Sequence, residues 1–231
     1  MNKPIISIII PCYNEESTIS KIIKKVTEIN LSKEIILVDD YSTDETRKII
    51  STYENKENFK IIYNNKNSGK GACIKAAQKF VTGEYVIIQD ADLEYDPNDY
   101  YAIIKEFKKK DPDVVYGSRL LDLQRSNFSS NSRIYINRLL TSVFNLLYRQ
   151  NITDAHTCYK SFKLELFKNI KLVENGFNFC AEINCKVANK KIKINEIAIS
   201  YNGRTHAEGK KIKFSDGIET LATYFKYLFK T

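Results

Sequence analysis

The sequence predicts an α/β fold in which a mostly parallel central sheet is flanked by helices. Short apolar runs alternate with amphipathic segments through residues 1–120, and this order is typical of parallel strands joined by right-handed crossovers. The apolar run at 5–10 indicates a strand that is covered on both faces. With 231 residues, 43% of them apolar, the chain is long enough for one sizeable domain and short for two.

The expected elements follow one another in order. A strand at 5–10 precedes a helix at 15–29, for which Asn14 is the expected N-cap. Residues 42–45 have the capping-box pattern and indicate a second helix after a strand at 34–38. The remaining elements of this half are strands at 59–63, 84–89 and 113–116 and helices at 71–80 and from Pro97 onward. Beyond residue 120 the pattern predicts a helix at 131–147, a strand at 192–200 and an amphipathic helix at 214–229.

Membrane-spanning and secreted classes are disfavoured by the apolar and cysteine content. No apolar stretch approaches the roughly 20 residues that a bilayer span requires, and the run at 5–10 is too short for a signal peptide. The five cysteines are odd in number and form no CxxC pair, which argues against a zinc ribbon or a disulfide framework. We therefore expect free thiols in a reducing compartment and a cytoplasmic location.

Arginines gather in one part of a basic chain. The formal charge is +8, and five of the seven arginines lie within 119–149, a window that holds one acid, no lysine and a net charge of +4. Arginine matches the geometry of phosphate groups. The window is therefore compatible with nucleic acid, an anionic membrane, a phosphorylated substrate or a solvated helix face.

Acidic or polar clusters follow three of the expected strands. They are Tyr13-Asn14-Glu15, Asp39-Asp40 and Asp90-Ala91-Asp92. Ligands of parallel sheets bind beyond the carboxyl ends of the strands, so the three clusters should converge on one crevice. Asp90 and Asp92 are two positions apart, which in an extended segment directs both carboxylates to one side. Together with Glu94 they are of the ligand type that Mg²⁺ or Mn²⁺ prefers.

Three other enzyme classes fit the residues less well. Glycoside hydrolysis uses two acids, but it explains neither the arginines nor the acidic ends of the first two strands. The segment Asn67–Gly71 is not a P-loop, because Lys70 is followed by glycine. A sugar-phosphate nucleotidyltransferase would place a loop rich in glycine and arginine after the first strand, where this chain has Pro-Cys-Tyr-Asn-Glu-Glu.

Together the motifs resemble family 2 glycosyltransferases of the GT-A type, specifically the dolichyl-phosphate mannose synthase-like branch of polyprenyl-phosphate glycosyltransferases. The segments that carry the resemblance are 9–16, 38–46, 67–71, 89–97, 114–119, 157–160 and 203–212. The resemblance spans nearly the whole chain and implies one GT-A domain over 1–231. Within it we expect a nucleotide-sugar-binding half at 1–120 and an acceptor-binding half at 121–231 that ends in the amphipathic helix.

The resemblance also implies roles for individual residues. Donor nucleotide binding falls to Pro11, Tyr13, Glu15, Asp40, Lys70 and Asp90. The divalent ion, Mg²⁺ or Mn²⁺, falls to Asp90, Asp92 and Glu94. The acceptor phosphate and the donor diphosphate fall to Arg119, Arg133, Arg204, Lys210 and Lys211.

The expected reaction is metal-dependent, inverting sugar transfer from a UDP- or GDP-linked donor, with Asp92 and Arg204 as catalytic groups. A polyprenyl phosphate, such as a dolichyl or undecaprenyl phosphate, is the expected acceptor, and it needs no general base because its second pKa is about 6. If the acceptor is instead a saccharide or protein hydroxyl, a base is required, and the candidates are Asp154, Glu182 and His156.

Two further questions concern partners. The helix at 214–229 either packs on the domain or anchors it peripherally on the cytoplasmic face of the membrane. A non-catalytic nucleotide-sugar-binding subunit is the alternative to an enzyme. We expect no nucleic-acid partner, because the basic window lacks interleaved aromatic residues for base stacking.

Overall fold

The computed structural model describes residues 3–128, 130–204 and 215–229, except for the side chains of residues 131, 133, 215 and 216. The chain forms two compact units. Unit 1 comprises residues 1–93 and 161–176, and unit 2 comprises residues 94–160 and 177–231. The functional halves predicted from the sequence, 1–120 and 121–231, stay a prediction.

Unit 1 is built on a sheet whose strands run in the order β3-β2-β1-β4-β7. The parallel strands are β1 (Ile6–Cys12), β2 (Lys33–Asp39), β3 (Phe59–Tyr63) and β4 (Tyr85–Ile88). The last strand, β7 (Lys160–Lys163), pairs with β4 in the antiparallel direction. The isoleucines of β1 at positions 6, 8, 9 and 10 are fully buried, which agrees with a strand covered on both faces.

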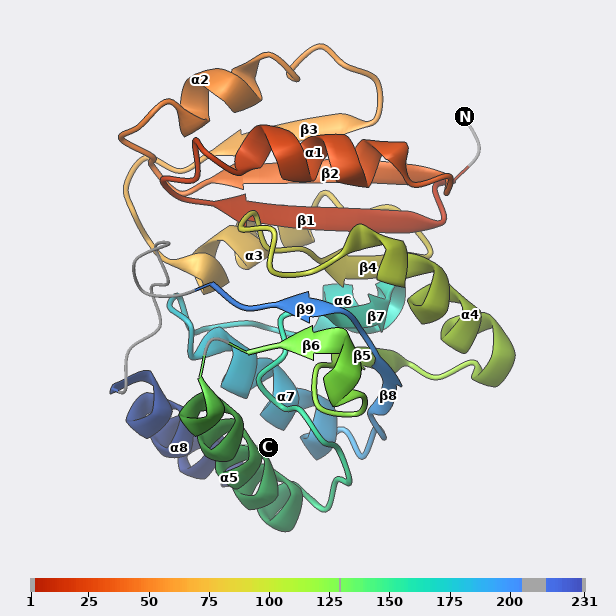
Figure 1. Ribbon diagram of the computed structural model, residues 1–231, viewed down its shortest axis with the longest axis vertical. Helices are drawn as coiled ribbons and strands as arrows, with labels where there is room; N and C mark the ends of the chain where they lie inside the picture. Colours follow the sequence, from red (N-terminus) through yellow and green to blue (C-terminus); the bar gives the residue numbers. More distant parts are fainter. Residues whose placement is uncertain (1–2, 129, 205–214, 230–231) are drawn as a thin grey trace. The chain divides into compact units, whose positions relative to one another are not determined.

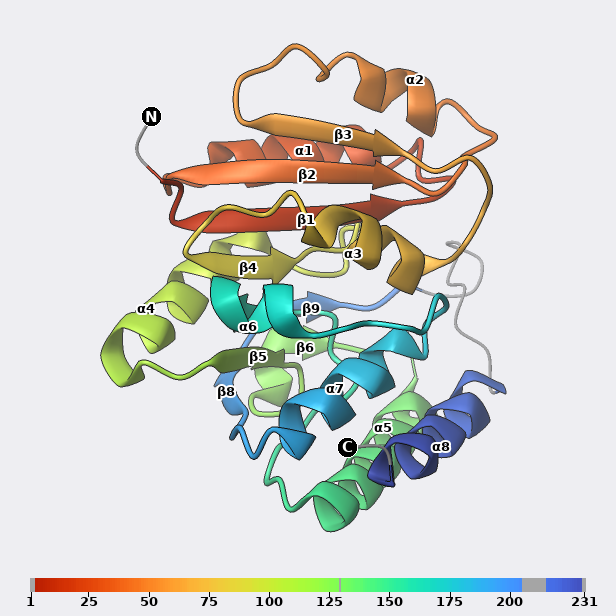
Figure 2. The ribbon, with the colours of Figure 1, turned by 180° about the vertical axis from the view of Figure 1, so that it is seen from behind.

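Helices cover both faces of this sheet. Figure 1 shows α1 (Ile19–Glu28) in front of the strands, and Figure 2 shows α3 (Lys70–Gln78) and α6 (Leu164–Asn169) on the opposite face. The short helix α2 (Thr46–Ser51) packs against α1. On α1 the side chains of Ile19, Ile22, Ile23 and Val26 are buried, as the helical spacing predicts.

The starts of the first two helices differ from the prediction. Helix α1 begins at Ile19 rather than at 15, and Asn14 has a left-handed φ of 51°. Asn14 is therefore not an N-cap; instead its side chain accepts a hydrogen bond from the amide of Thr43 at 2.8 Å. At α2 the amide of Thr46 donates to Asp44 at 3.0 Å. The bond of Asn14 joins the loop after β1 to the loop after β2 across 29 positions, a tertiary contact that local patterns do not contain. The bond of Asp44, in contrast, is local.

Unit 2 contains two short parallel strand pairs and a cluster of helices. One pair is β5 (Val114–Ser118) with β8 (Asn195–Ala198), and the other is β6 (Ser126–Asn127) with β9 (Tyr201–Asn202). Its helices are η1 (Pro97–Asp99), α4 (Tyr100–Lys110), η2 (Leu123–Arg125), α5 (Asn131–Tyr148), α7 (Phe179–Asn189) and α8 (Ser215–Leu228).

Helices α5, α7 and α8 pack together. The hydroxyl of Tyr148 on α5 donates to the carbonyl oxygen of Tyr224 on α8 at 2.7 Å, and the Tyr227 hydroxyl donates to Glu182 on α7 at 2.9 Å. The inner face of the C-terminal amphipathic helix is therefore packed on its unit. Within the described ranges, no helix combines the length and the apolar character needed to cross a bilayer.

Candidate functional site

The predicted nucleotide-binding residues of unit 1 follow the carboxyl ends of neighbouring strands. Pro11 is the second-to-last residue of β1, Asp40 follows β2, and Asp90 comes two residues after β4. The amide of Asp40 donates to the carbonyl oxygen of Cys12 at 2.9 Å, so the pairing of β1 and β2 continues to the edge. The prediction that these clusters meet at one edge of a parallel sheet agrees with this placement.

Glu15 is held at the end of β1 by two threonines. Its amide donates to the Thr46 hydroxyl at 2.8 Å, and its carboxylate accepts from the Thr18 hydroxyl at 2.9 Å. Only 8% of Glu15 is exposed, whereas Pro11 and Tyr13 are half-buried. Tyr13 and Pro11 therefore present more of their surface to solvent than the carboxylate that follows them.

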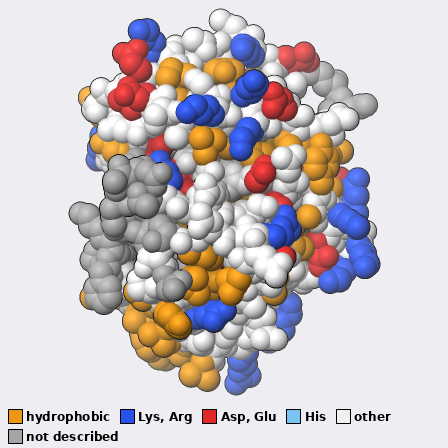
Figure 3. All heavy atoms as spheres, in the orientation of Figure 1, with side chains coloured by type: hydrophobic (Ala, Val, Ile, Leu, Met, Phe, Trp, Pro, Cys, Tyr) orange, Lys and Arg blue, Asp and Glu red, His pale blue; other side chains and the backbone are white. Residues whose placement is uncertain are grey.

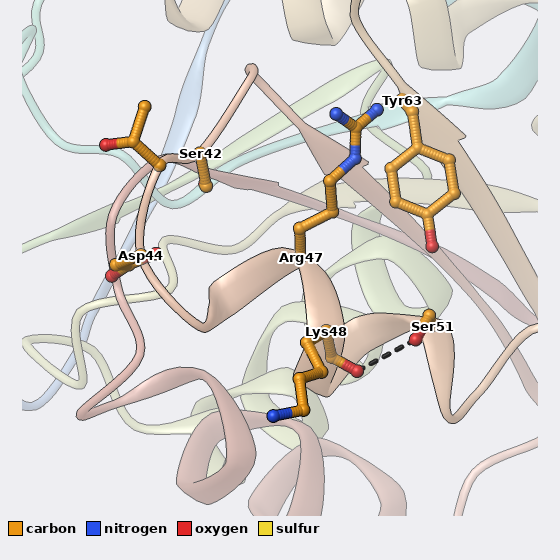
Figure 4. Close-up of a pocket in the computed structure, with 7 residues that line it drawn as sticks. Ser42, Asp44, Arg47, Lys48, Ser51 and Tyr63 are labelled. Carbon is orange, nitrogen blue, oxygen red and sulfur yellow. Dashed lines mark hydrogen bonds between the residues drawn. The ribbon is translucent and has the colours of Figure 1, made fainter.

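Asp39 organises the loop that follows β2. Its carboxylate accepts from the Ser42 amide at 3.2 Å and lies 3.7 Å from Nε of Arg47. The Arg47 guanidinium lies 4.6 Å from the centre of the Tyr63 ring. Figure 4 shows Arg47 beside Tyr63 at the wall of a hollow that also includes Ser42 and Asp44.

Asp40 anchors the Asn-Ser-Gly-Lys-Gly segment. Its carboxylate accepts from the side-chain amide of Asn64 at 2.7 Å, from the amide of Ser68 at 3.0 Å and from the amide of Gly69 at 2.7 Å. Bonds of this kind to an ionised carboxylate are the stronger ones in proteins. In the structure Asp40 therefore positions the loop that enters α3.

Gly69 is required at this loop for two reasons. Its φ of 93° is in the region that L side chains rarely adopt, and a Cβ atom would lie 2.6 Å from the carbonyl oxygen of Asn175. The amide of Ala72 donates to that same oxygen at 3.1 Å. The backbone of the 173–176 segment thus closes directly over the start of α3.

Lys70 and Asp90 form an ion pair in unit 1. The ammonium group of Lys70, the first residue of α3, contacts Oδ1 of Asp90, and the two side chains are only 10% and 15% exposed. The hydrogen bonds of Asp40 and this ion pair form one chain of contacts from β2 through the 64–70 loop to the residues after β4. These contacts therefore link three of the predicted donor-site residues, namely Asp40, Lys70 and Asp90.

The carboxylates predicted for the metal ion have the right chemistry for Mg²⁺ or Mn²⁺, because all three offer hard oxygen donors. Asp90 and Asp92 belong to unit 1, and Glu94 belongs to unit 2. Asp92 lies half-buried in the turn after β4. Among the described residues, no three His, Cys, Asp or Glu side chains are grouped as an ion-binding set.

Glu94 has a second set of contacts that sequence analysis did not anticipate. Its Oε2 accepts from the Tyr201 hydroxyl at 2.9 Å, and its Oε1 accepts from the backbone amide of Arg204 at 2.8 Å. Its own carbonyl oxygen accepts from the Asn202 amide at 2.8 Å. Glu94, at 7% exposure, thereby holds β9 and the start of the Arg204 segment within unit 2.

Tyr201 is the centre of an aromatic cluster in unit 2. Its ring centre lies 5.2 Å from that of Tyr95, 5.1 Å from that of Phe128 and 5.0 Å from the guanidinium of Arg119. Sequence analysis missed Tyr201, because the strand predicted at 192–200 ends one residue before it. The alternation of large apolar residues at 197, 199 and 201 could have included Tyr201 in that strand.

Arg119 forms a buried salt bridge with Asp154. The guanidinium donates to the two carboxylate oxygens at 2.7 and 2.8 Å, and the Arg119 amide donates to the same carboxylate at 3.1 Å. Burial raises the pKa of Asp154, but the charge and hydrogen bonds of Arg119 outweigh it and leave the pKa below its usual value. Asp154 is fully buried and Arg119 is 7% exposed. This geometry argues against Asp154 as a general base and gives Arg119 a structural partner.

The other two candidate bases are also held inside unit 2. Burial lowers the pKa of His156 to about 4, so the imidazole is neutral near pH 7. Glu182 is fully buried and accepts from Lys186 at 2.7 Å and from the Tyr227 hydroxyl at 2.9 Å. Neither group has the exposed geometry of a base that approaches a substrate hydroxyl.

The structure describes only some of the remaining residues that were predicted to bind phosphate. Arg133 lies in α5 and Arg204 follows β9, with 18% of the Arg204 side chain exposed. Lys210 and Lys211 lie outside the described residues. Beyond Tyr201, sequence analysis missed Asn64, Ser42 and Thr46 as partners of Asp40, Asn14 and Glu15. These partners are 24, 28 and 31 positions apart, whereas helical and strand patterns relate residues a few positions apart.

Comparison with known proteins assigns the chain to a family. The model of glycosyl transferase family 2 matches residues 7–171. The low-salt glycan biosynthesis hexosyltransferase Agl6 of Haloferax volcanii is 28% identical over 218 residues, which are 93% of this chain and 51% of that protein. The dolichyl-phosphate beta-glucosyltransferase ALG5D of Trichomonas vaginalis is 27% identical over 234 residues, covering 93% of this chain and 70% of that protein. The chain thus spans about half the length of the first of these relatives.

A solved structure with the same fold is glucosyl-3-phosphoglycerate synthase of Mycobacterium tuberculosis, crystallised with Mn²⁺, UDP and phosphoglyceric acid. It superimposes with a TM-score of 0.72 at 15% identity and covers 98% of this chain and 79% of the synthase. This likeness confirms the predicted GT-A fold. The family match covers well over half of the sequence, and we conclude that the chain belongs to glycosyl transferase family 2.

Proposed function

We propose that this protein transfers a sugar from a nucleotide-diphosphate donor to a polyprenyl phosphate in a metal-dependent, inverting reaction. The observation that carries the proposal is the connected edge of unit 1, where Asp40 bonds to Gly69 and the next residue, Lys70, pairs with Asp90. This edge joins both predicted sides of a nucleotide site, the residues after β2 and the residues after β4.

In the proposed reaction, Pro11, Tyr13, Glu15 and Asp40 bind the base and ribose, with Lys70 and Asp90 beside them. Asp92, with Asp90 and Glu94, is the proposed holder of Mg²⁺ or Mn²⁺, an ion that supplies positive charge to the leaving diphosphate when bound. The proposed donor is a UDP- or GDP-linked sugar; the synthase of the same fold was crystallised with Mn²⁺ and UDP.

A phosphate acceptor fits the buried state of the candidate bases. A lipid monophosphate is mostly ionised near pH 7, since its second pKa is about 6, and it attacks without a proton acceptor. Asp154 is paired with Arg119, and His156 is neutral and half-buried. A relative acts on dolichyl phosphate according to its name. Arg133, Arg204, Lys210 and Lys211 are the proposed contacts to the acceptor and donor phosphates.

We infer that the reaction occurs at the cytoplasmic face of a membrane. The acceptor class is a membrane lipid, and all five cysteines are free thiols, as expected in a reducing compartment.

Thermal shift with nucleotide sugars, with and without Mn²⁺, tests the donor. A ligand at 100 times its Kd stabilises the folded state by about 2.7 kcal/mol, so the true donor should raise the melting temperature clearly. The follow-up assay measures donor turnover with a polyprenyl phosphate and with free glycans.

The variant Asp92→Asn removes a proposed ion ligand without changing side-chain volume, and Asp113→Asn, at an exposed position, is the matched control. We expect metal-dependent turnover to be lost only in Asp92→Asn. Wild-type turnover by Asp92→Asn would overturn its metal role, and turnover only with glycans would overturn the lipid acceptor.

A further inference from the structure

Helix α5 exposes a stripe of large apolar side chains. Tyr135, Leu139 and Leu146 are 70%, 66% and 81% exposed. They are four and seven positions apart, which places them on one side of the helix. Buried residues such as Leu140 and Phe144 occupy the other side, so the exposed stripe is separate from the surface that packs into unit 2.

Helix α8 carries a second stripe of the same kind. Ile218 and Phe225 are 62% and 53% exposed, and Phe229, the residue directly after α8, is 84% exposed. Ala222, between Ile218 and Phe225 at helical spacing, is also exposed. The opposite side packs through Tyr224 and Tyr227, which are 0% and 5% exposed. The amphipathic helix is therefore packed on one side and apolar on the side that faces solvent.

The two stripes belong to one packed pair of helices. The Phe144 and Tyr224 rings lie 5.4 Å apart, and the Tyr148 hydroxyl bonds to the Tyr224 carbonyl oxygen. Figures 1 and 2 both show α5 beside α8, and Figure 3 shows hydrophobic side chains gathered where these helices lie. Soluble monomers rarely expose apolar patches beyond a few hundred Å², and larger ones mark interaction surfaces. We call the two stripes the α5/α8 face.

The charges around this face indicate its partner. Helix α5 contains arginines but no acidic residue. Arg138 and Arg149 are exposed and follow Tyr135 and Leu146 by three positions. On α8, exposed Lys226 follows Phe225 and exposed Glu219 follows Ile218, so the described charges beside the two stripes are three cations and one acid. Apolar side chains flanked by cations are typical of surfaces that lie in the interface of an anionic bilayer. Pairing of two copies through this face would bring the same cations together, which is unfavourable.

We propose that the α5/α8 face docks the protein onto an anionic membrane, with the apolar stripes inserted among the lipids and the cations at the headgroups. This inference rests on the proposed function, because a lipid-phosphate acceptor is presented at such a surface. The inference adds to the proposed function which surface of the protein contacts the membrane.

The test is flotation of the full chain with vesicles of phosphatidylcholine alone or with about 30% phosphatidylglycerol. The variants are Leu139→Ser/Leu146→Ser and Phe225→Ser/Phe229→Ser. The control is Val173→Ser/Phe177→Ser, because those side chains are also exposed, at 61% and 44%, but belong to neither α5 nor α8. Since two inserted apolar side chains are lost, each face variant should partition at least about tenfold less onto anionic vesicles. The control should partition like the wild type.

The proposal is overturned if both face variants float like the wild type, or if the wild type floats equally with both kinds of vesicle. It is also overturned if the protein does not float but forms a dimer that the face variants abolish. Turnover with a short, water-soluble isoprenyl phosphate separates this result from the proposed function. The face variants should keep wild-type turnover with it, whereas absent turnover in a protein that floats normally would refute the proposed function alone.

Discussion

At the scale of residues, the buried pair Arg119–Asp154 changes the interpretation of the basic window. An arginine that a sequence presents as a phosphate ligand makes two hydrogen bonds to a carboxylate that has no solvent exposure. The charge therefore serves first to neutralise Asp154 inside unit 2. The arginines of this window thus have different roles: Arg138 and Arg149 are exposed, and Arg125, also exposed, lies 2.7 Å from the carboxylate of Asp99.

Breaking this pair should cost far more stability than removing it whole. In Arg119→Met or Asp154→Leu one buried charge loses its partner, and we expect a loss of about 3–5 kcal/mol in the free energy of unfolding. The double variant should recover much of that loss. Urea denaturation of the four proteins measures the coupling, and single variants within 1 kcal/mol of the wild type would contradict the pairing.

Glu94 has two candidate roles that a pair of variants separates. Tyr201→Phe removes the hydroxyl that bonds to Glu94 at 2.9 Å but keeps the carboxylate, whereas Glu94→Gln removes the charge. If Glu94 binds the metal ion, only Glu94→Gln should raise the Mn²⁺ concentration that gives half-maximal turnover. If Glu94 instead positions Arg204, both variants should lower turnover and leave its dependence on Mn²⁺ unchanged. Titration of turnover with Mn²⁺ distinguishes the two.

At the scale of elements, the loop between β3 and α3 depends on one glycine. Gly69→Ala would place a methyl group 2.6 Å from the Asn175 carbonyl oxygen at a φ of 93°. We expect a loss of about 1–3 kcal/mol in stability, and weaker donor binding because Lys70 follows directly.

The matched control for this substitution is Gly217→Ala in α8. A Cβ atom there meets only Leu140 at 3.9 Å, and alanine is favoured over glycine in a helix by about 0.5–1 kcal/mol. Thermal melts should therefore move in opposite directions for the two variants. Equal shifts, or a stabilised Gly69→Ala, would show that the loop does not need its left-handed conformation.

At the scale of the whole molecule, stability should depend on pH through His156. Its pKa is lowered by burial from 6.5 to about 4 in the folded state, so the unfolded chain binds more protons between these values. The free energy of unfolding should consequently fall as the pH is lowered from about 6.5 to about 4. Because the imidazole is half-buried, we expect a loss of ~2 kcal/mol.

Denaturation at several pH values checks this dependence, with His156→Gln as the comparison. The glutamine variant should show a flatter profile above pH 4. Below that range Asp154 adds a second loss of the same sign. Its folded pKa lies below the usual value, so its contribution is present above the unfolded pKa and is lost as the pH falls through the folded one. A profile that is unchanged in His156→Gln would refute the assignment.

Much of unit 1 could be predicted from the sequence because its signals are local. The strand at 59–63 was predicted with its observed bounds. In unit 2, α5 also begins at the predicted residue 131. Strand β7 and helices α6 and α7 were not predicted. Strand β7 has only four residues, one of them the buried Lys160, and such a short mixed segment has no usable periodicity.

The amino-acid order by itself determined the family, the parallel strands and the placement of carboxylates after them, since each of these is written in neighbouring residues. Only the tertiary structure decided which charged side chains are buried and paired inside the protein. Arg119 meets Asp154 across 35 positions, Asp40 meets Gly69 across 29, and Glu94 meets Tyr201 across 107. Helical and strand patterns relate residues a few positions apart, whereas a buried charge requires a partner wherever the fold brings one.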